Sequence, residues 1–162
     1  MLLDNTSEIQ DMFVTYPDPL NKKYKIGARI RKKTNTEVKM TRRNGPLKIE
    51  VNVPLELELI SIPSMLGYGD DLQKQKKLKQ SIERLLENRL KKLVEKTQKK
   101  FKSEPFYWSL EIRPLFSSVK EYEKWDWTNK NFPFADINVN VDIEIIGFGK
   151  QIKEEEMKKV RD

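Results

Sequence analysis

The feature that most constrains the fold is a segment near the C-terminus in which apolar and polar residues alternate without a break. Residues 137–145 place isoleucine or valine at every odd position and asparagine, aspartate or glutamate at every even position. Because neighbouring side chains of a β-strand point to opposite faces, this pattern predicts a strand with one buried and one solvent-facing side. Residues 47–59 repeat the alternation. Proline cannot donate a hydrogen bond within a sheet, so Pro54 predicts a bend, a bulge or an edge position there.

Two further strands are expected from shorter alternations. Residues 24–31 form the first, and a weaker one runs through Val38 and Met40 after a turn at 34–36. Asn44-Gly45 then predicts a tight turn into the 47–59 strand, because both residues tolerate a positive φ. Together these three strands predict an antiparallel meander with one apolar face. The aromatic-rich segment 108–112 is a candidate for another short strand.

A long amphipathic helix is expected between residues 71 and 102. Asp70 or Asp71 can cap its first turn, and Pro105 follows its end. Residues 119–125 predict a short helix, and Ile9, Met12 and Phe13 suggest another. The predicted fold class is therefore α+β, an antiparallel sheet packed on one face by the long helix and a short helix. The apolar residues of the long helix are three and four positions apart, at Leu78, Ile82, Leu85, Leu86, Leu90, Leu93, Val94 and Phe101.

A chain of 162 residues fits one domain. We expect an entry segment at 1–20, a core at 23–149 and a charged tail at 150–162. No run of eighteen apolar residues predicts a membrane-spanning helix, and the first residues lack the pattern of a signal peptide. Any membrane attachment would therefore need a segment outside these residues.

The net charge of +7 raises the alternative of a basic nucleic-acid-binding α+β module. The helix at 71–102 is rich in lysine and arginine, but Glu83, Glu87 and Glu95 lie among them. Mixed charges of this kind are typical of a solvated helix face. Charged strands also prevent unwanted strand pairing, which accounts for a second basic group around the first hairpin. That group consists of Arg29, Arg31, Lys32, Lys33, Arg42 and Arg43.

Nothing in the sequence predicts catalysis. The chain contains neither histidine nor cysteine, which removes the commonest general base, thiolate nucleophiles and most transition-metal ligands. The acidic pairs Glu56/Glu58 and Asp142/Glu144 lack the third ligand that a hard cation needs. No phosphate loop, dinucleotide fingerprint or nucleophile elbow is present. We therefore expect no catalytic residue, no bound metal and no cofactor.

Two groups of residues are candidates for partner binding. Trp125, Trp127, Phe132 and Phe134 either close one end of the core or form a binding platform. The polar face of the last strand is poor in strand-forming residues, which indicates contact with water or a polar partner. The sequence thus suggests a joint docking surface. Its members are Trp125, Trp127, Asn138, Asn140, Asp142 and Glu144.

Three stretches, taken in order, give the chain a family resemblance. They are Arg31-Lys32-Lys33-Thr34 through Gly45-Pro46-Leu47-Lys48-Ile49-Glu50-Val51, the helix centred on Ile82-Glu83-Arg84-Leu85-Leu86, and Trp127 through Gly149. Across residues 23–149 the chain resembles the C-terminal domain of the Ger(x)C lipoproteins, the C subunits of bacterial spore nutrient-germinant receptors. It departs from them at 103–110, where family members usually carry an Asp-containing, glycine-rich segment.

The resemblance implies a non-catalytic receptor domain that acts through protein–protein interaction in nutrient-triggered germination. It implies membrane-embedded A and B subunits as partners, and no nucleic acid. It also implies a location on the outer face of the spore inner membrane, reached through a lipid anchor that lies outside this sequence. This chain would itself be soluble.

Overall fold

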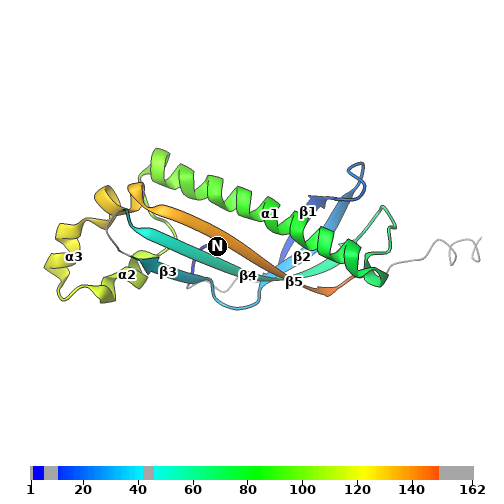
Figure 1. Ribbon diagram of the computed structural model, residues 1–162, viewed down its shortest axis with the longest axis horizontal. Helices are drawn as coiled ribbons and strands as arrows, with labels where there is room; N and C mark the ends of the chain where they lie inside the picture. The colour runs from blue at the N-terminus through cyan, green and yellow to red at the C-terminus, as the bar shows by residue number, and fades with distance from the viewer. Residues whose placement is uncertain (1, 6–10, 42–45, 150–162) are drawn as a thin grey trace, which may run out of the picture.

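The computed structural model describes residues 2–5, 11–41 and 46–149 (Figure 1). Ile9, the Asn44-Gly45 turn and the charged tail lie outside the described residues. Within the described residues, five strands and three α-helices follow one another, with short 3-10 and π turns between them. The strands are β1 Met12–Pro17, β2 Lys25–Lys32, β3 Glu37–Thr41, β4 Lys48–Ser61 and β5 Asp136–Gly147, and the helices are α1 Leu72–Lys96, α2 Ser109–Ile112 and α3 Val119–Trp125.

The sheet is built around β4, the longest strand. β5 pairs with it in parallel along one edge, from Lys48 opposite Asp136 to Glu58 opposite Gly147. β2 and β3 share the other edge of β4 end to end, both antiparallel, and β1 pairs with β2. The predicted α+β class is confirmed. The meander is not formed as expected, because β2 and β3 both pair with β4 rather than with each other.

Pro54 lies in the middle of the sheet, not at its edge. β3 pairs with β4 as far as Asn52, and β2 pairs from Leu55 onward. Between them the Pro54 carbonyl accepts a hydrogen bond from the Lys33 amide at 3.0 Å. The amide nitrogen and the carbonyl of one strand residue point toward the same neighbouring strand. The Pro54 nitrogen, which carries no hydrogen to donate, therefore faces the junction between β2 and β3. The proline therefore removes no hydrogen bond from a paired position.

Helix α1 runs along β5 and packs on one face of the sheet (Figure 1). Asp71 caps its first turn by accepting hydrogen bonds from the amides of Gln73 and Lys74 at 2.9 and 3.1 Å. A π turn, Thr97–Phe101, extends the helix until Lys102 adopts a left-handed φ of 47°, so the helix ends before Pro105. The expected packing is confirmed for most of the stripe: the buried core includes Ile49, Val51, Val53, Val139, Val141 and Ile143 from the sheet with Leu78, Ile82, Leu86, Leu90 and Val94 from α1. Leu85 and Leu93 are partly buried, and the assignment of Phe101 to the stripe was wrong, because its ring lies beyond the sheet contact and is 55% exposed.

Two local predictions were wrong. Residues 12–17 form a strand rather than a helix, because Met12, Val14 and Tyr16 face inward at strand spacing while Phe13 is 73% exposed. Residues 109–112 form a helix rather than a strand. Trp108 and Ile112 are both buried, as the spacing of four in a helix allows, whereas Leu110 is 46% exposed. The predicted short helix at 119–125 is confirmed as α3.

Candidate functional site

One face of the sheet is covered by α1, and the other is open and polar. The open face carries the even-numbered residues of β5, and Asn138, Asn140, Asp142 and Glu144 are all exposed there. The register places them beside the even-numbered residues of β4. The Asn140 amide donates to the side-chain oxygen of Asn52 at 3.1 Å, and Asn138 donates to Asn140 at 3.3 Å. A row of amides thus crosses the middle of this open face.

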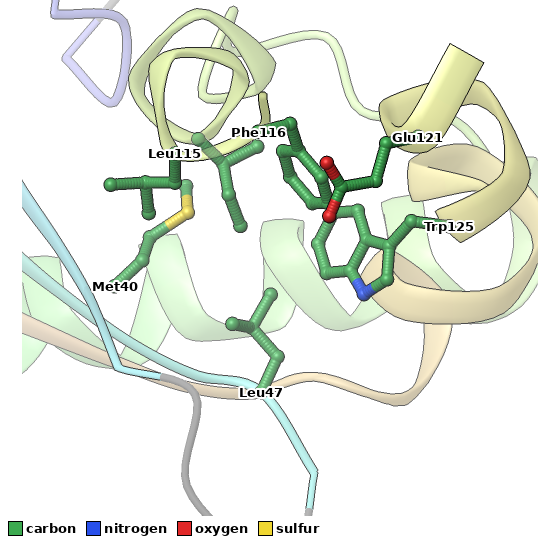
Figure 2. A pocket seen from close by; sticks show the side chains of 7 residues that line it. Met40, Leu47, Leu115, Phe116, Glu121 and Trp125 are labelled. Carbon is green, nitrogen blue, oxygen red and sulfur yellow. The ribbon is translucent and has the colours of Figure 1, made fainter. Parts of the chain in front are cut away.

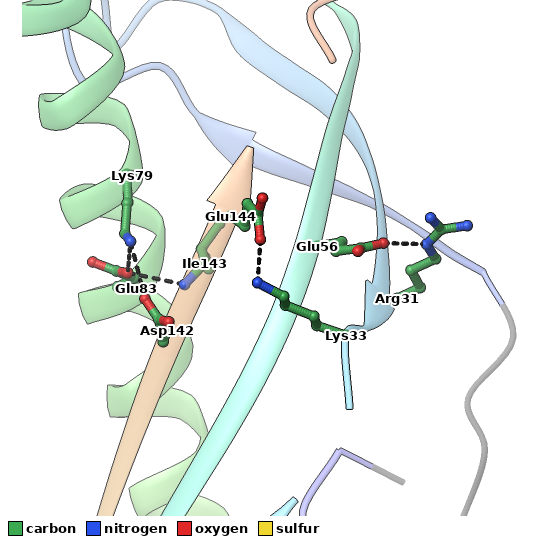
Figure 3. Close-up of polar contacts among 8 residues, drawn as sticks. All are labelled: Arg31, Lys33, Glu56, Lys79, Glu83, Asp142, Ile143 and Glu144. Atoms are coloured by element: carbon green, nitrogen blue, oxygen red, sulfur yellow. Dashed lines mark hydrogen bonds and ion pairs between the residues drawn. The ribbon is translucent and has the colours of Figure 1, made fainter. Parts of the chain in front are cut away.

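Ion pairs cross the open face near the C-terminal ends of β4 and β5 (Figure 3). Arg29 pairs with Glu58 and Arg31 pairs with Glu56, each at 2.5 Å. Lys33 pairs with Glu144, and this hydrogen bond and the charge of Glu144 raise the pKa of the Lys33 ammonium. Exposed pairs contribute little stability, so their main effect is on the local charge. They balance Arg29, Arg31 and Lys33 of the basic group around the first hairpin, which weakens the nucleic-acid alternative at these three residues. Arg42 and Arg43 lie outside the described residues.

Acidic side chains of α1 occupy part of the outer edge of β5 (Figure 3). The Glu83 carboxylate accepts a hydrogen bond from the Ile143 amide at 3.0 Å, and Glu87 accepts one from the Val141 amide at 3.1 Å. Lys79 lies between Asp142 at 2.9 Å and Glu83 at 3.5 Å. Its hydrogen bond to Asp142 is the largest of the effects that raise the pKa of Lys79. Because these amides already have acceptors, another strand cannot pair with β5 at these positions.

The aromatic residues gather at the end of the sheet beside α2 and α3. Trp127 is 4% exposed and Phe132 is fully buried. Trp125 stacks on Trp127 with ring centroids 5.8 Å apart. A small cavity of about 170 Å³ opens beside Trp125 (Figure 2). Its lining consists of Met40, Leu47, Ile112, Leu115, Phe116, Glu121 and Trp125.

The structure does not bring the six predicted docking residues together. Met40 lines the cavity and is paired with Ile49, which is fully buried. Residues opposite each other in a sheet share a face, so the cavity and Trp125 lie on the α1-covered face. Asn138, Asn140, Asp142 and Glu144 lie on the open face. Trp127 is buried in the core, which agrees with the alternative that the aromatic residues close one end of the core. Phe134 does not share this burial, because its side chain is 73% exposed.

Sequence reasoning missed the residues that complete the open face and its edge. Glu83 and Glu87 are four positions apart on α1, which places them on one side of the helix, but nothing in the sequence says that this side lies along β5. Within the described part of the chain, no group of three acidic side chains is placed to hold a metal ion. No helix among the same residues is long and apolar enough to cross a membrane.

The comparisons with known proteins identify the family. Residues 1–149 match the family model described as "Spore germination B3/ GerAC like, C-terminal". The chain belongs to this family. The GerAC-like domain also superposes on a solved structure titled "Crystal Structure of the GerBC protein", with a TM-score of 0.61 and 20% identity. No curated protein matches it in sequence.

The match to the GerBC structure covers 85% of the GerAC-like domain and 41% of that chain. At this identity the match shows that the two proteins share a fold. The GerAC-like domain therefore spans less than half the length of the solved protein. The resemblance drawn from the sequence motifs is confirmed by both findings.

Proposed function

We propose that this GerAC-like domain is part of the C subunit of a spore nutrient-germinant receptor, where it acts by protein–protein contact rather than by catalysis. The family match over residues 1–149 is the observation that carries the proposal. The shared fold with the GerBC protein supports it. The partners would be the membrane-embedded A and B subunits, at the outer face of the spore inner membrane.

We assign the contact with these subunits to the open face of the sheet. The opposite face is covered by α1, and part of the β5 edge is occupied by Glu83 and Glu87. The open face presents amides and alternating charges in rows across β2, β4 and β5. A surface with both signs of charge complements the polar rim of another protein better than it complements a polyanion.

The substitution Asn140→Arg tests this assignment. Asn140 lies in the middle of the open face, where an arginine would place a long cationic side chain inside the proposed contact. We expect the amount of A and B subunits that copurify with the C subunit from spore membranes to fall at least tenfold. A tenfold weaker affinity corresponds to about 1.4 kcal/mol of binding free energy. The free energy of unfolding should change by less than about 1 kcal/mol, because Asn140 is exposed.

The matched control is Asn35→Arg, the same change at an exposed position in the connection between β2 and β3. It should leave copurification unchanged. If Asn140→Arg copurifies with its partners as well as the wild-type protein does, the contact is not made by the open face.

A further inference from the structure

The side chains of α1 are sorted by charge around the helix in a repeat of four residues. Positions 78, 82, 86, 90 and 94 face the core and are buried. Opposite them lie positions 76, 80, 84, 88, 92, 96 and 100, and every one of these is exposed. We call this stripe the basic ridge, and it contains no carboxylate. Its residues are Lys76, Gln80, Arg84, Asn88, Lys92, Lys96 and Lys100.

Two of the three carboxylates that appeared to balance these charges in the sequence are directed elsewhere. Glu83 and Glu87 accept hydrogen bonds from β5, on the flank of the helix beside the sheet. Glu95 is exposed and pairs with Lys99 at 3.9 Å. Two of the three carboxylates are therefore turned toward β5, and Glu95 stays beside the exposed ridge. Rows of residues four apart are inclined to the axis of an α-helix, so the basic ridge winds around α1 as it advances about 36 Å at 1.5 Å per residue.

Two features beside the ridge suit an amphipathic ligand. A shallow hollow of about 350 Å³ lies where Arg84 and Lys77 approach the loop after β1, and Ser81, Gln80, Pro19 and Leu20 complete its lining. It offers two cations and a hydroxyl group next to apolar carbon. At the far end of the ridge, the Phe101 ring is 55% exposed, with the Lys96 ammonium 5.3 Å from its centroid.

We propose that the basic ridge of α1 binds an anionic phospholipid surface. A cluster of four to eight lysines and arginines on one side of an amphipathic helix is a recognised electrostatic site for acidic headgroups. Because the ridge winds around α1, a flat surface contacts the part of the ridge that faces it, and the long lysine and arginine side chains extend this contact. The hollow can accept one headgroup phosphate, and Phe101 can enter the interfacial layer as aromatic side chains do. The ridge lies on the opposite side of the domain from the open face, so the two surfaces can be occupied together.

The ridge fits lipid better than nucleic acid. Binding of single strands relies on several aromatic side chains on which successive bases stack. The stripe from 76 to 100 contains none, and Phe101 beside it offers a single exposed ring.

The test is sedimentation of the full chain with vesicles of phosphatidylglycerol mixed with phosphatidylcholine, and with vesicles of phosphatidylcholine alone. We expect binding to the anionic vesicles only, weakening as salt is raised. The ridge variant combines Arg84→Gln, Lys92→Gln and Lys96→Gln. Each cation near an anionic membrane strengthens binding roughly fivefold, so this variant should bind about 100-fold more weakly.

The control variant removes one arginine and two lysines that lie outside α1, Arg113→Gln, Lys120→Gln and Lys124→Gln. Both variants lower the net charge from +7 by three. The control should bind within about threefold of the wild-type chain. No binding to anionic vesicles at low salt, or an equal loss in both variants, would overturn the proposal. So would duplex DNA that binds the ridge more tightly than the vesicles at the same salt concentration.

Discussion

Replacing Trp127 by alanine is expected to lower the free energy of unfolding by about 3–5 kcal/mol. The indole is 4% exposed, stacks on Trp125 and lies 5.6 Å from the buried Phe132 ring, measured between centroids. Its N–H donates to the Glu104 carboxylate at 3.4 Å, so truncation also removes a polar contact. Chemical denaturation followed by circular dichroism measures the change.

The matched control is Phe134→Ala. Phe134 follows the same aromatic segment but is 73% exposed, so its removal should cost less than about 0.5 kcal/mol. A Trp127→Ala protein of wild-type stability that fails to bind its partner would contradict the core assignment. It would restore Trp127 to the docking surface that the sequence suggested.

The second large effect is expected at Asp18, in the loop after β1. Its carboxylate is fully buried and accepts hydrogen bonds from the hydroxyls of Ser64 and Tyr68. It also accepts from the Leu20 and Asn21 amides at 2.9 and 3.2 Å. These bonds join the β1–β2 loop to the loop that leads into α1. Asp18→Ala leaves the buried Tyr68 hydroxyl without this acceptor, and we expect a loss of about 3 kcal/mol at neutral pH.

The same group predicts a dependence of stability on pH. Burial raises the pKa of Asp18, but the hydrogen bonds from Ser64, Tyr68 and the two amides outweigh it and hold the pKa below its usual value of 3.8. A carboxyl with a lowered pKa in the folded state stabilises the protein above its unfolded pKa, and this contribution is lost as the pH falls through the folded pKa. The stability gap between the wild-type chain and Asp18→Ala should therefore narrow below about pH 4. A gap that stays constant down to pH 2 would show that the charge of Asp18 plays no part.

Much of the fold could be predicted from the sequence because its strands and helix have regular periods. The alternation at 47–59 and 137–145 placed the buried residues of β4 and β5 on the correct face, and the spacing along α1 placed its core stripe. Strand pairing could not be predicted in the same way. Periodicity says which face is buried but not which strand is the neighbour, and β5 reaches β4 only after a connection of 74 residues, from 62 to 135.

The candidate site could be predicted only in part, for a similar reason. The exposure of Asn138, Asn140, Asp142 and Glu144 follows from strand geometry alone. Trp125 and Trp127 precede β5 by only about ten residues in the sequence. The two turns between them and β5, η4 (Trp127–Asn131) and η5 (Phe132–Phe134), nevertheless leave both indoles on the α1-covered side of the sheet. The direction of Glu83 and Glu87 depends on where α1 lies over the sheet, and this is set by packing between distant segments.

The central claim is that this domain serves nutrient sensing in spores, and germination itself tests it most directly. Spores that lack the coding region for residues 1–149 would be exposed to a panel of nutrients, and the fall in optical density would be recorded. Spores with the region restored and a trigger that bypasses nutrient receptors would serve as controls. We predict that the response to at least one nutrient is lost and regained on restoration, while the bypass trigger still works. An unchanged response to every nutrient that triggers wild-type spores would contradict the account.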